Sequence, residues 1–152
     1  MTLLVAAAYF FIILKYIKAW RALPGWKVPK GFSPHTRVSI VVPARNEEEN
    51  IGVCLESLSA LHYPGHLLEI IVVDDHSTDD TFEIINGFSK KNKIFKPLRL
   101  ARFIKKNAPI NSFKKKAIET AIAQASGQLI VTTDADCEVS PEWLLLLVSF
   151  FE

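Results

Sequence analysis

Two carboxylates separated by one small residue, Asp134 and Asp136, directly follow a short apolar run late in the chain. Side chains two residues apart along an extended segment point to the same side, so both acids are expected to face one site. At a separation of about 4 Å and an effective dielectric constant of about 20, their repulsion is on the order of 4 kcal/mol. A hard divalent cation with oxygen ligands relieves this repulsion. The alternative for the motif alone is a solvated acidic turn after a strand.

The elements that would position these acids are short strands alternating with helical segments. Residues 129–133, 38–42 and 70–73 are apolar and rich in β-branched residues, which predicts strands. Strands alternating with helices are typical of a parallel sheet built from βαβ units. The carboxyl ends of parallel strands lie along one edge, where ligands usually bind. Polar residues after the first two strands are therefore expected to join the acidic pair: Arg45, Asn46, Asp74 and Asp75.

The helices are predicted from apolar periodicity and capping residues. Asn46 with Glu49 three residues later is typical of a capping box, which predicts a helix over 47–61. Ser77 with Asp80 is a similar signal, for a helix that ends at about residue 89. Gly127 is placed to end a further helix. The remaining predicted elements are a weaker strand over 95–100, a basic loop over 101–111, and two helices over 114–125 and 141–152.

The first 20 residues are expected to form a transmembrane or membrane-anchor helix. Residues 3–14 are uncharged, although this run is shorter than the roughly 20 residues that span a bilayer. Lys15 and Lys18 follow the apolar run, whereas a cleaved signal peptide carries its positive charge before it. By the positive-inside rule, the rest of the chain is then cytoplasmic. The alternative is an interfacial or buried helix. Residues 21–37, with several prolines and glycines, are predicted to be a linker.

Several classes of protein are excluded. The net charge of +2 does not suggest a nucleic-acid-binding protein. Cys54 and Cys137 are too far apart for a Cys-x-x-Cys metal site and too few for a disulfide framework. Neither G-x-G-x-x-G nor a P-loop motif occurs, which argues against the usual dinucleotide and P-loop sites. Short segments resemble response-regulator receivers and haloacid-dehalogenase phosphatases, but the residues that those sites require further along are absent.

Four motifs, in order and with matching spacing, resemble glycosyltransferase family 2. They are VSIVVPARNEE at 38–48, EIIVVDDHSTDDT at 69–81, KKKAIETAI at 114–122 and GQLIVTTDAD at 127–136. The resemblance covers residues 38–151. It implies a GT-A fold, which is a Rossmann-like α/β fold with a mostly parallel sheet and flanking helices. Residues 38–152 would form its nucleotide-sugar-binding part, with the C-terminal part of the fold missing.

The resemblance also assigns residues to the nucleoside of a bound nucleotide-diphosphate sugar. Pro43, Ala44 and Arg45 would enclose the base. Glu47 would reach the ribose, and Asp75 would accept a hydrogen bond from the ring N–H of the base. UDP is the expected nucleotide.

Two further residues lie where the family contacts the turn and the diphosphate. Asp74 would hold the turn through Ser77, although a helix-capping acid is an equally simple interpretation. Lys114 would approach the diphosphate. Because Phe113 replaces the glycine usual before this lysine, the resemblance does not settle which of the lysines at 114–116 acts, and a solvated helix start is the alternative.

The acidic pair completes the implied site. Asp134 would contact the ribose or the donor sugar, and Asp136, with Asp134 beside it, would bind Mg²⁺ or Mn²⁺. The implied activity is inverting transfer of the sugar to a membrane lipid or glycan acceptor, with the general base expected beyond Glu152. Glu138 is the one spare acid close to the pair in sequence. The alternative function is a membrane-tethered nucleotide-binding module without transferase activity.

Overall fold

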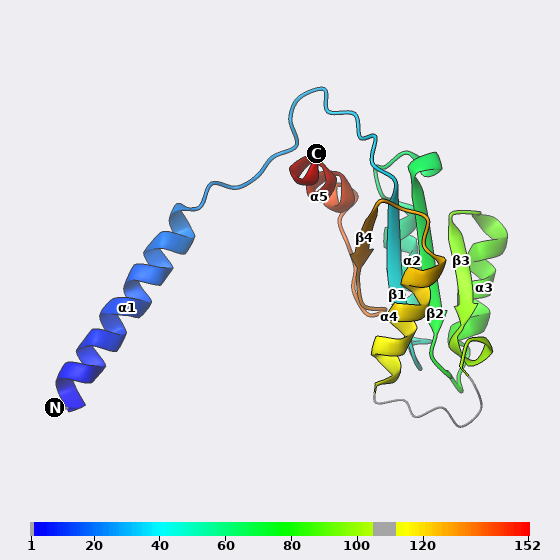
Figure 1. Ribbon diagram of the computed structural model, residues 1–152, viewed down its shortest axis with the longest axis horizontal. Helices are drawn as coiled ribbons and strands as arrows, with labels where there is room; N and C mark the ends of the chain where they lie inside the picture. The colour runs from blue at the N-terminus through cyan, green and yellow to red at the C-terminus, as the bar shows by residue number, and fades with distance from the viewer. Residues whose placement is uncertain (1, 105–111) are drawn as a thin grey trace.

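Parallel strands form the central sheet, as the alternation of apolar runs and helical segments predicts. In the computed structural model, which describes residues 2–104 and 112–152, four strands pair in the order β3-β2-β1-β4 (Figure 1). They are β1 Val38–Ala44, β2 Leu68–Asp74, β3 Phe95–Arg99 and β4 Leu129–Thr132. Strands β1 and β2 are buried along their whole length, which explains their nearly continuous apolar sequences.

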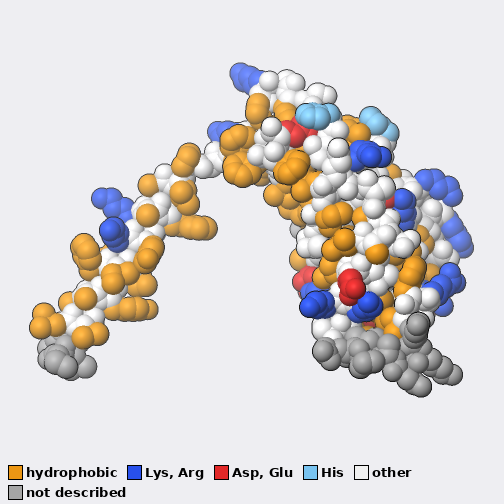
Figure 2. Space-filling view, in the orientation of Figure 1, with side chains coloured by type: hydrophobic (Ala, Val, Ile, Leu, Met, Phe, Trp, Pro, Cys, Tyr) orange, Lys and Arg blue, Asp and Glu red, His pale blue; other side chains and the backbone are white. Residues whose placement is uncertain are grey.

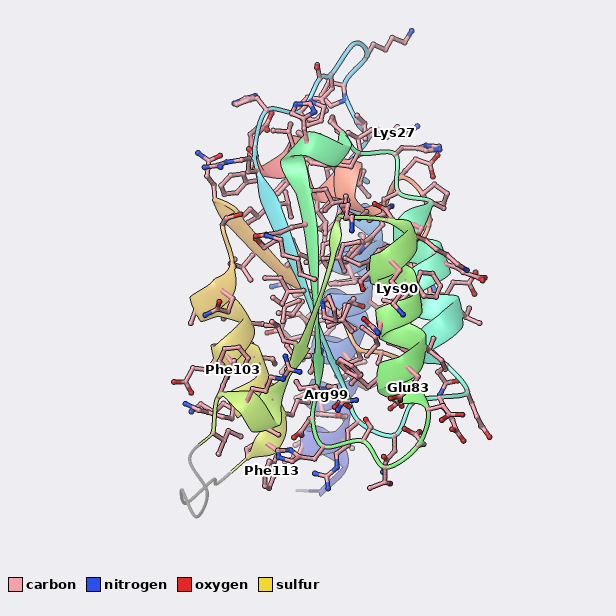
Figure 3. The ribbon with its side chains drawn as sticks, turned by 90° about the vertical axis from the view of Figure 1, so that its right-hand side faces the viewer. Lys27, Glu83, Lys90, Arg99, Phe103 and Phe113 are labelled. Atoms are coloured by element: carbon pink, nitrogen blue, oxygen red, sulfur yellow. The ribbon has the colours of Figure 1, made fainter. Side chains whose placement is uncertain are left out.

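Helices cover both faces of the sheet. The helices α2 Ile51–Ser59, α3 Thr81–Lys91 and α5 Trp143–Phe151 share a hydrophobic core with Ile40 and Val42 of β1. Helix α4 Phe113–Gln124 packs on the opposite face, against Val41. Successive side chains of a strand point to opposite faces, so β1 contributes to both cores. Figure 3 shows α3 and α4 on the two sides of the strands. Two short 3-10 helices are η1 Gly65–Leu67 and η2 Leu100–Arg102.

Helix α2 begins later than predicted. Its N-cap is Asn50, and the capping box expected at Asn46 does not form. Asn46 instead adopts a left-handed conformation with φ of 53°. Its side-chain oxygen accepts a hydrogen bond from the Thr78 backbone N–H at 2.9 Å. Asn46 therefore joins the loops that follow β1 and β2, and the prediction of a helix from residue 47 is wrong.

Other boundaries differ for similar long-range reasons. Strand β1 continues through Pro43, which was expected to end it, because its last two residues pair with β2. Helix α4 ends at Gln124, so Gly127 does not terminate it. A Cβ at Gly127 would lie 2.5 Å from the backbone nitrogen of Ser39, which shows that glycine is needed for close approach to β1. Helix α5 has Glu142 as its N-cap, so it begins after Pro141. The basic-loop prediction falls largely on residues 105–111, outside the described residues.

The N-terminal residues form helix α1, Thr2–Ala22. Figure 1 shows α1 projecting away from the sheet, joined to it by an extended segment. Within the part of the chain that the structure describes, no helix is both long and apolar enough to cross a membrane. A transmembrane helix is therefore not shown, and the anchoring of residues 1–20 in a membrane stays a prediction. The charges of Lys15, Lys18 and Arg21 lie inside the helix and shorten its uncharged length.

A buried carboxylate, Glu69, connects several elements near the amino ends of the strands. It accepts hydrogen bonds from the hydroxyl of Ser39 on β1 and the ammonium of Lys96 on β3. It also accepts from Ser126, through the backbone N–H at 2.6 Å and the hydroxyl at 3.0 Å. Burial acts to raise the pKa of Glu69, but the hydrogen bonds outweigh it and lower the pKa to about 2. The ionised carboxylate thus holds β1, β2, β3 and the segment before β4 together.

Candidate functional site

The residues predicted to form the site meet in one pocket at the carboxyl ends of the strands. The pocket has a volume of about 440 Å³, and Asp74 and Asn46 are the two residues expected at this edge that do not line it. Its lining residues are Pro43, Ala44, Arg45, Glu47, Asp75, Phe113, Lys114, Asp134, Ala135 and Asp136. Asp74 is buried beside the pocket, where its carboxylate accepts from the Ser77 backbone N–H at 3.2 Å. Glu138 is not among the lining residues, although it follows the acidic pair closely.

Hydrogen bonds between two loops fix one wall of this pocket. The Asn46 backbone N–H donates to the Ser77 hydroxyl at 3.0 Å, and the Asn46 side chain accepts from Thr78 in return. The Glu47 backbone N–H donates to the hydroxyl of Thr81, which is fully buried, at 2.8 Å. These contacts join the loop after β1 to the loop after β2. The side chains that line the pocket from these loops are therefore carried on a backbone fixed at several points.

Asp75 lies in an enclosed corner of the pocket, with 4% of its surface exposed. His76 Nδ1 is 2.9 Å from one carboxylate oxygen, and Arg45 Nη1 is 3.9 Å from the other. The Phe113 ring lies between these partners: its centroid is 5.6 Å from the Arg45 guanidinium and 5.5 Å from the His76 ring. Figure 3 shows Phe113 at the same end of the sheet as Arg99, the last residue of β3.

Phe113, like the small residue Ala135, lines the pocket but was not assigned to the site from the sequence. In the sequence it stands out only as a departure from the usual glycine before the lysines. The signal in the sequence that could have found it is its position next to Lys114. The aromatic ring and the Arg45 guanidinium make this corner suited to stacking against a planar ring.

The acidic end of the pocket is more open. The Lys114 ammonium is 2.7 Å from an Asp134 carboxylate oxygen, and about half or more of each side chain is exposed. This hydrogen bond raises the pKa of Lys114 above its ordinary value. Lys116 is instead 3.2 Å from Glu119, one turn along α4. Of the three lysines that the sequence left open, Lys114 is therefore the one placed at the acidic pair.

The donor set at this end fits a cation that is shared with a ligand. Among the described residues, no group of three or more His, Cys, Asp or Glu side chains could hold a metal ion without help. Asp134 and Asp136 nevertheless line one pocket and offer hard carboxylate oxygens. Mg²⁺ is typically held by one or two carboxylates together with substrate phosphates and water. Two acids in a pocket large enough for a diphosphate satisfy that requirement.

The neighbouring thiol is unsuited to catalysis. Cys54 is buried beneath the acidic end, and its sulfur is 3.6 Å from the Asp134 backbone oxygen. Burial raises the pKa of the Cys54 thiol to about 12, so the reactive thiolate is scarcely populated at neutral pH. The chemistry of the pocket therefore depends on carboxylates, one lysine, one arginine and aromatic rings.

Comparison with known proteins identifies this arrangement. The sequence model of Glycosyl transferase family 2 matches residues 39–152, which include all the lining residues. The chain belongs to this family. The parallel α/β sheet with helices on both faces also confirms the GT-A fold that the motifs implied.

The chain is similar to proteins whose names refer to different sugars and acceptors. It is 32% identical over 118 residues to a beta-monoglucosyldiacylglycerol synthase of Synechocystis, covering 78% of this chain and 23% of that protein. Among solved structures, it is similar to a mannosyltransferase of Pyrobaculum calidifontis in complex with GDP-Man and Mn²⁺. That match has 27% identity and a TM-score of 0.73, and covers 98% of this chain and 42% of the other.

A second solved structure, S. aureus TarS in complex with UDP-GlcNAc, has 29% identity and a TM-score of 0.62. The match covers 76% of this chain and 31% of that chain. This chain spans about a quarter of the length of the curated relatives that it matches. The similarity therefore covers most of this chain but less than a third of the Synechocystis synthase and of TarS.

Proposed function

We propose that this chain binds the donor in an enzyme that transfers a sugar from a UDP-sugar to a lipid or polysaccharide acceptor, with inversion and with Mg²⁺ or Mn²⁺. The observation that carries the proposal is that one pocket is lined by the buried carboxylate of Asp75, the ammonium of Lys114 and the exposed acidic pair. The related synthase named for a diacylglycerol lipid supports the acceptor class. The TarS complex with UDP-GlcNAc supports the donor.

The enclosed corner would bind the base. Asp75 can accept a hydrogen bond from a ring N–H of the base. The base would stack near the Arg45 guanidinium and the Phe113 ring, two planar groups that contact each other in this structure. Pro43 and Ala44, at the end of β1, would form the wall beneath it. Glu47, which is held between the two loops, would accept from a ribose hydroxyl.

The open end would bind the diphosphate and the sugar. Lys114 would donate to phosphate oxygens, and Asp134 would accept from a hydroxyl of the ribose or the sugar. Asp136, with Asp134, would hold the divalent cation, whose bound charge would stabilise the departing diphosphate. Inversion requires that a deprotonated acceptor hydroxyl displace the diphosphate directly at the anomeric carbon. A carboxylate beside a cation is a poor base, so we assign the general base to neither member of the acidic pair.

A lipid acceptor would be reached at a membrane surface, and we propose that the domain lies on the cytoplasmic side of that membrane. Helix α1 would keep it there. The cations that follow the apolar run motivate this orientation, as the positive-inside rule describes.

Calorimetry of UDP binding tests the role of the acidic pair. Wild-type protein is expected to bind UDP at least about tenfold more tightly with Mn²⁺ than with EDTA, because the ion neutralises both partners. Asp136→Asn should remove most of this difference. Glu138→Gln is the matched control, since it removes a nearby exposed carboxylate that does not line the pocket. Equal UDP affinity with Mn²⁺ and with EDTA would exclude the proposed metal role.

Substituting Lys114 by Gln should have two opposite effects. UDP binding should weaken by about tenfold, because a charged hydrogen bond to phosphate is lost. Binding of Mn²⁺ alone should strengthen by at most about fivefold, since an exposed ion pair that competes for Asp134 contributes about 0–1 kcal/mol. Calorimetric titrations with each ligand measure both effects, with Lys115→Gln as the control. Weaker binding of both ligands would show that Lys114 acts only by maintaining the local structure.

A further inference from the structure

The charges of this chain are divided very unevenly along the sequence. Residues 1–46 contain seven of the 18 Lys and Arg residues and none of the 16 Asp and Glu residues. The first acid is Glu47, at the pocket. The remaining 106 residues therefore carry eleven basic and sixteen acidic side chains, and are net acidic. The near-neutral net charge of the whole chain is thus the sum of a basic part, residues 1–46, and a net acidic part, residues 47–152.

Helix α1 exposes both apolar and basic side chains. Lys15, Lys18 and Arg21 recur every three residues, so they lie along one side of its second half. Tyr16 and Trp20 fall on the other side, and they are 70% and 77% exposed. Figure 2 shows hydrophobic side chains along most of the helix, with Lys and Arg side chains among them. Aromatic and basic side chains side by side are typical of helices that lie at a lipid–water interface.

The segment after α1 continues the basic charge and is attached to the domain. Lys27 and Lys30 lie on either side of its glycine and proline residues. Between α1 and Lys27, the Trp26 indole donates to the Ser149 hydroxyl of α5 at 2.9 Å. The same indole meets the Phe150 ring edge-on, with 5.2 Å between the centroids. A surface bound by α1 would therefore be held close to the folded domain.

We propose that α1 and residues 23–30, called here the basic arm, bind a lipid surface rich in anionic headgroups. An apolar helix alone would bind neutral and anionic lipid alike. Five cations without any acid add attraction to anionic headgroups, and each cation near such a surface strengthens binding by about fivefold. The inference deepens the membrane association proposed above and rests on it, but it is independent of sugar transfer.

Binding of the whole 152-residue chain to lipid vesicles tests the proposal. Sedimentation with phosphatidylcholine vesicles is compared with sedimentation with vesicles that contain about 30% phosphatidylglycerol. We expect binding to the anionic vesicles to be at least about tenfold tighter in 0.1 M salt, and the difference to shrink in 0.5 M salt. A triple variant, K15Q/K18Q/R21Q, should lose most of the preference for anionic lipid.

The matched control removes the same number of charges from the folded domain. The variant K90Q/K91Q/K93Q changes exposed lysines at and just after the end of α3, far along the chain from the basic arm. It should keep the preference. UDP binding by all variants is measured in parallel. A variant that loses lipid binding can then be distinguished from one that loses nucleotide binding at the pocket.

Three results would overturn the proposal. Equal affinity for neutral and anionic vesicles would show that only the apolar side chains act. An equal loss in both triple variants would show an effect of net charge alone. Absence of vesicle binding together with self-association that depends on α1, measured by analytical ultracentrifugation, would identify a second copy of the chain as the partner of the helix.

Discussion

Substituting Asp75 by Asn is expected to weaken UDP binding by about a hundredfold, both with Mn²⁺ and with EDTA. The carboxylate is 4% exposed, and a hydrogen bond to a buried charged group contributes roughly 1.5–3 kcal/mol. An Asn amide can also turn a donor toward the ring N–H, which leaves two donors facing each other. Calorimetric titration with UDP in both conditions measures the effect.

The control for this substitution is Asp80→Asn. Asp80 lies five residues further along, is exposed, and makes no side-chain capping hydrogen bond at the start of α3. Its substitution should leave UDP affinity within about twofold of wild type. If Asp75→Asn binds UDP as tightly as wild type, the base does not occupy the enclosed corner. If it loses affinity only with Mn²⁺, Asp75 acts on the cation and not on the base.

Substituting Glu69 by Gln should destabilise the domain by about 3 kcal/mol at pH 7 and change how stability depends on pH. The pKa of Glu69 is about 2 in the folded protein, against 4.5 for an ordinary glutamate. A lowered folded-state pKa contributes stability that is fully present above pH 4.5 and is lost as the pH falls toward 2. By linkage, this difference corresponds to about 3 kcal/mol.

Urea unfolding at pH 7, 5, 4 and 3 measures this contribution. Wild-type protein should lose stability steadily below pH 5, and the Glu69→Gln variant should lose less over the same interval. Glu56→Gln, at an exposed position of α2, is the control and should follow wild type. Parallel pH profiles for wild type and Glu69→Gln would show that Glu69 is not the group whose protonation weakens the fold.

The sheet and the place of the pocket could be predicted because both depend on local sequence. Strands β1 and β2 are buried throughout, which explains their nearly continuous apolar sequences, and polar residues follow at their carboxyl ends. Parallel strands then bring those ends together whatever the details of the loops. Arg45, Asp75 and Asp134 could therefore be placed at one edge before their contacts were known.

Long-range contacts explain the parts that could not be predicted. Asn46 has the sequence of a helix cap, but its partner is Thr78, in a loop that a local pattern does not connect to it. Gly127 has the position of a helix end, but glycine is needed there because the backbone approaches Ser39, 88 residues earlier. Glu69 sits in an apolar strand, and its donors come from three other parts of the chain. Such pairs need the assembled fold.

We expect the pocket at the carboxyl ends of the strands to bind a nucleoside diphosphate, with a divalent cation at the acidic pair. Anomalous diffraction at the manganese edge, from crystals of this chain grown with UDP and Mn²⁺, tests it directly. We expect one anomalous peak at the Asp136 carboxylate, with the base beside Asp75. UDP bound elsewhere, or an ion bound only at other carboxylates, would contradict it.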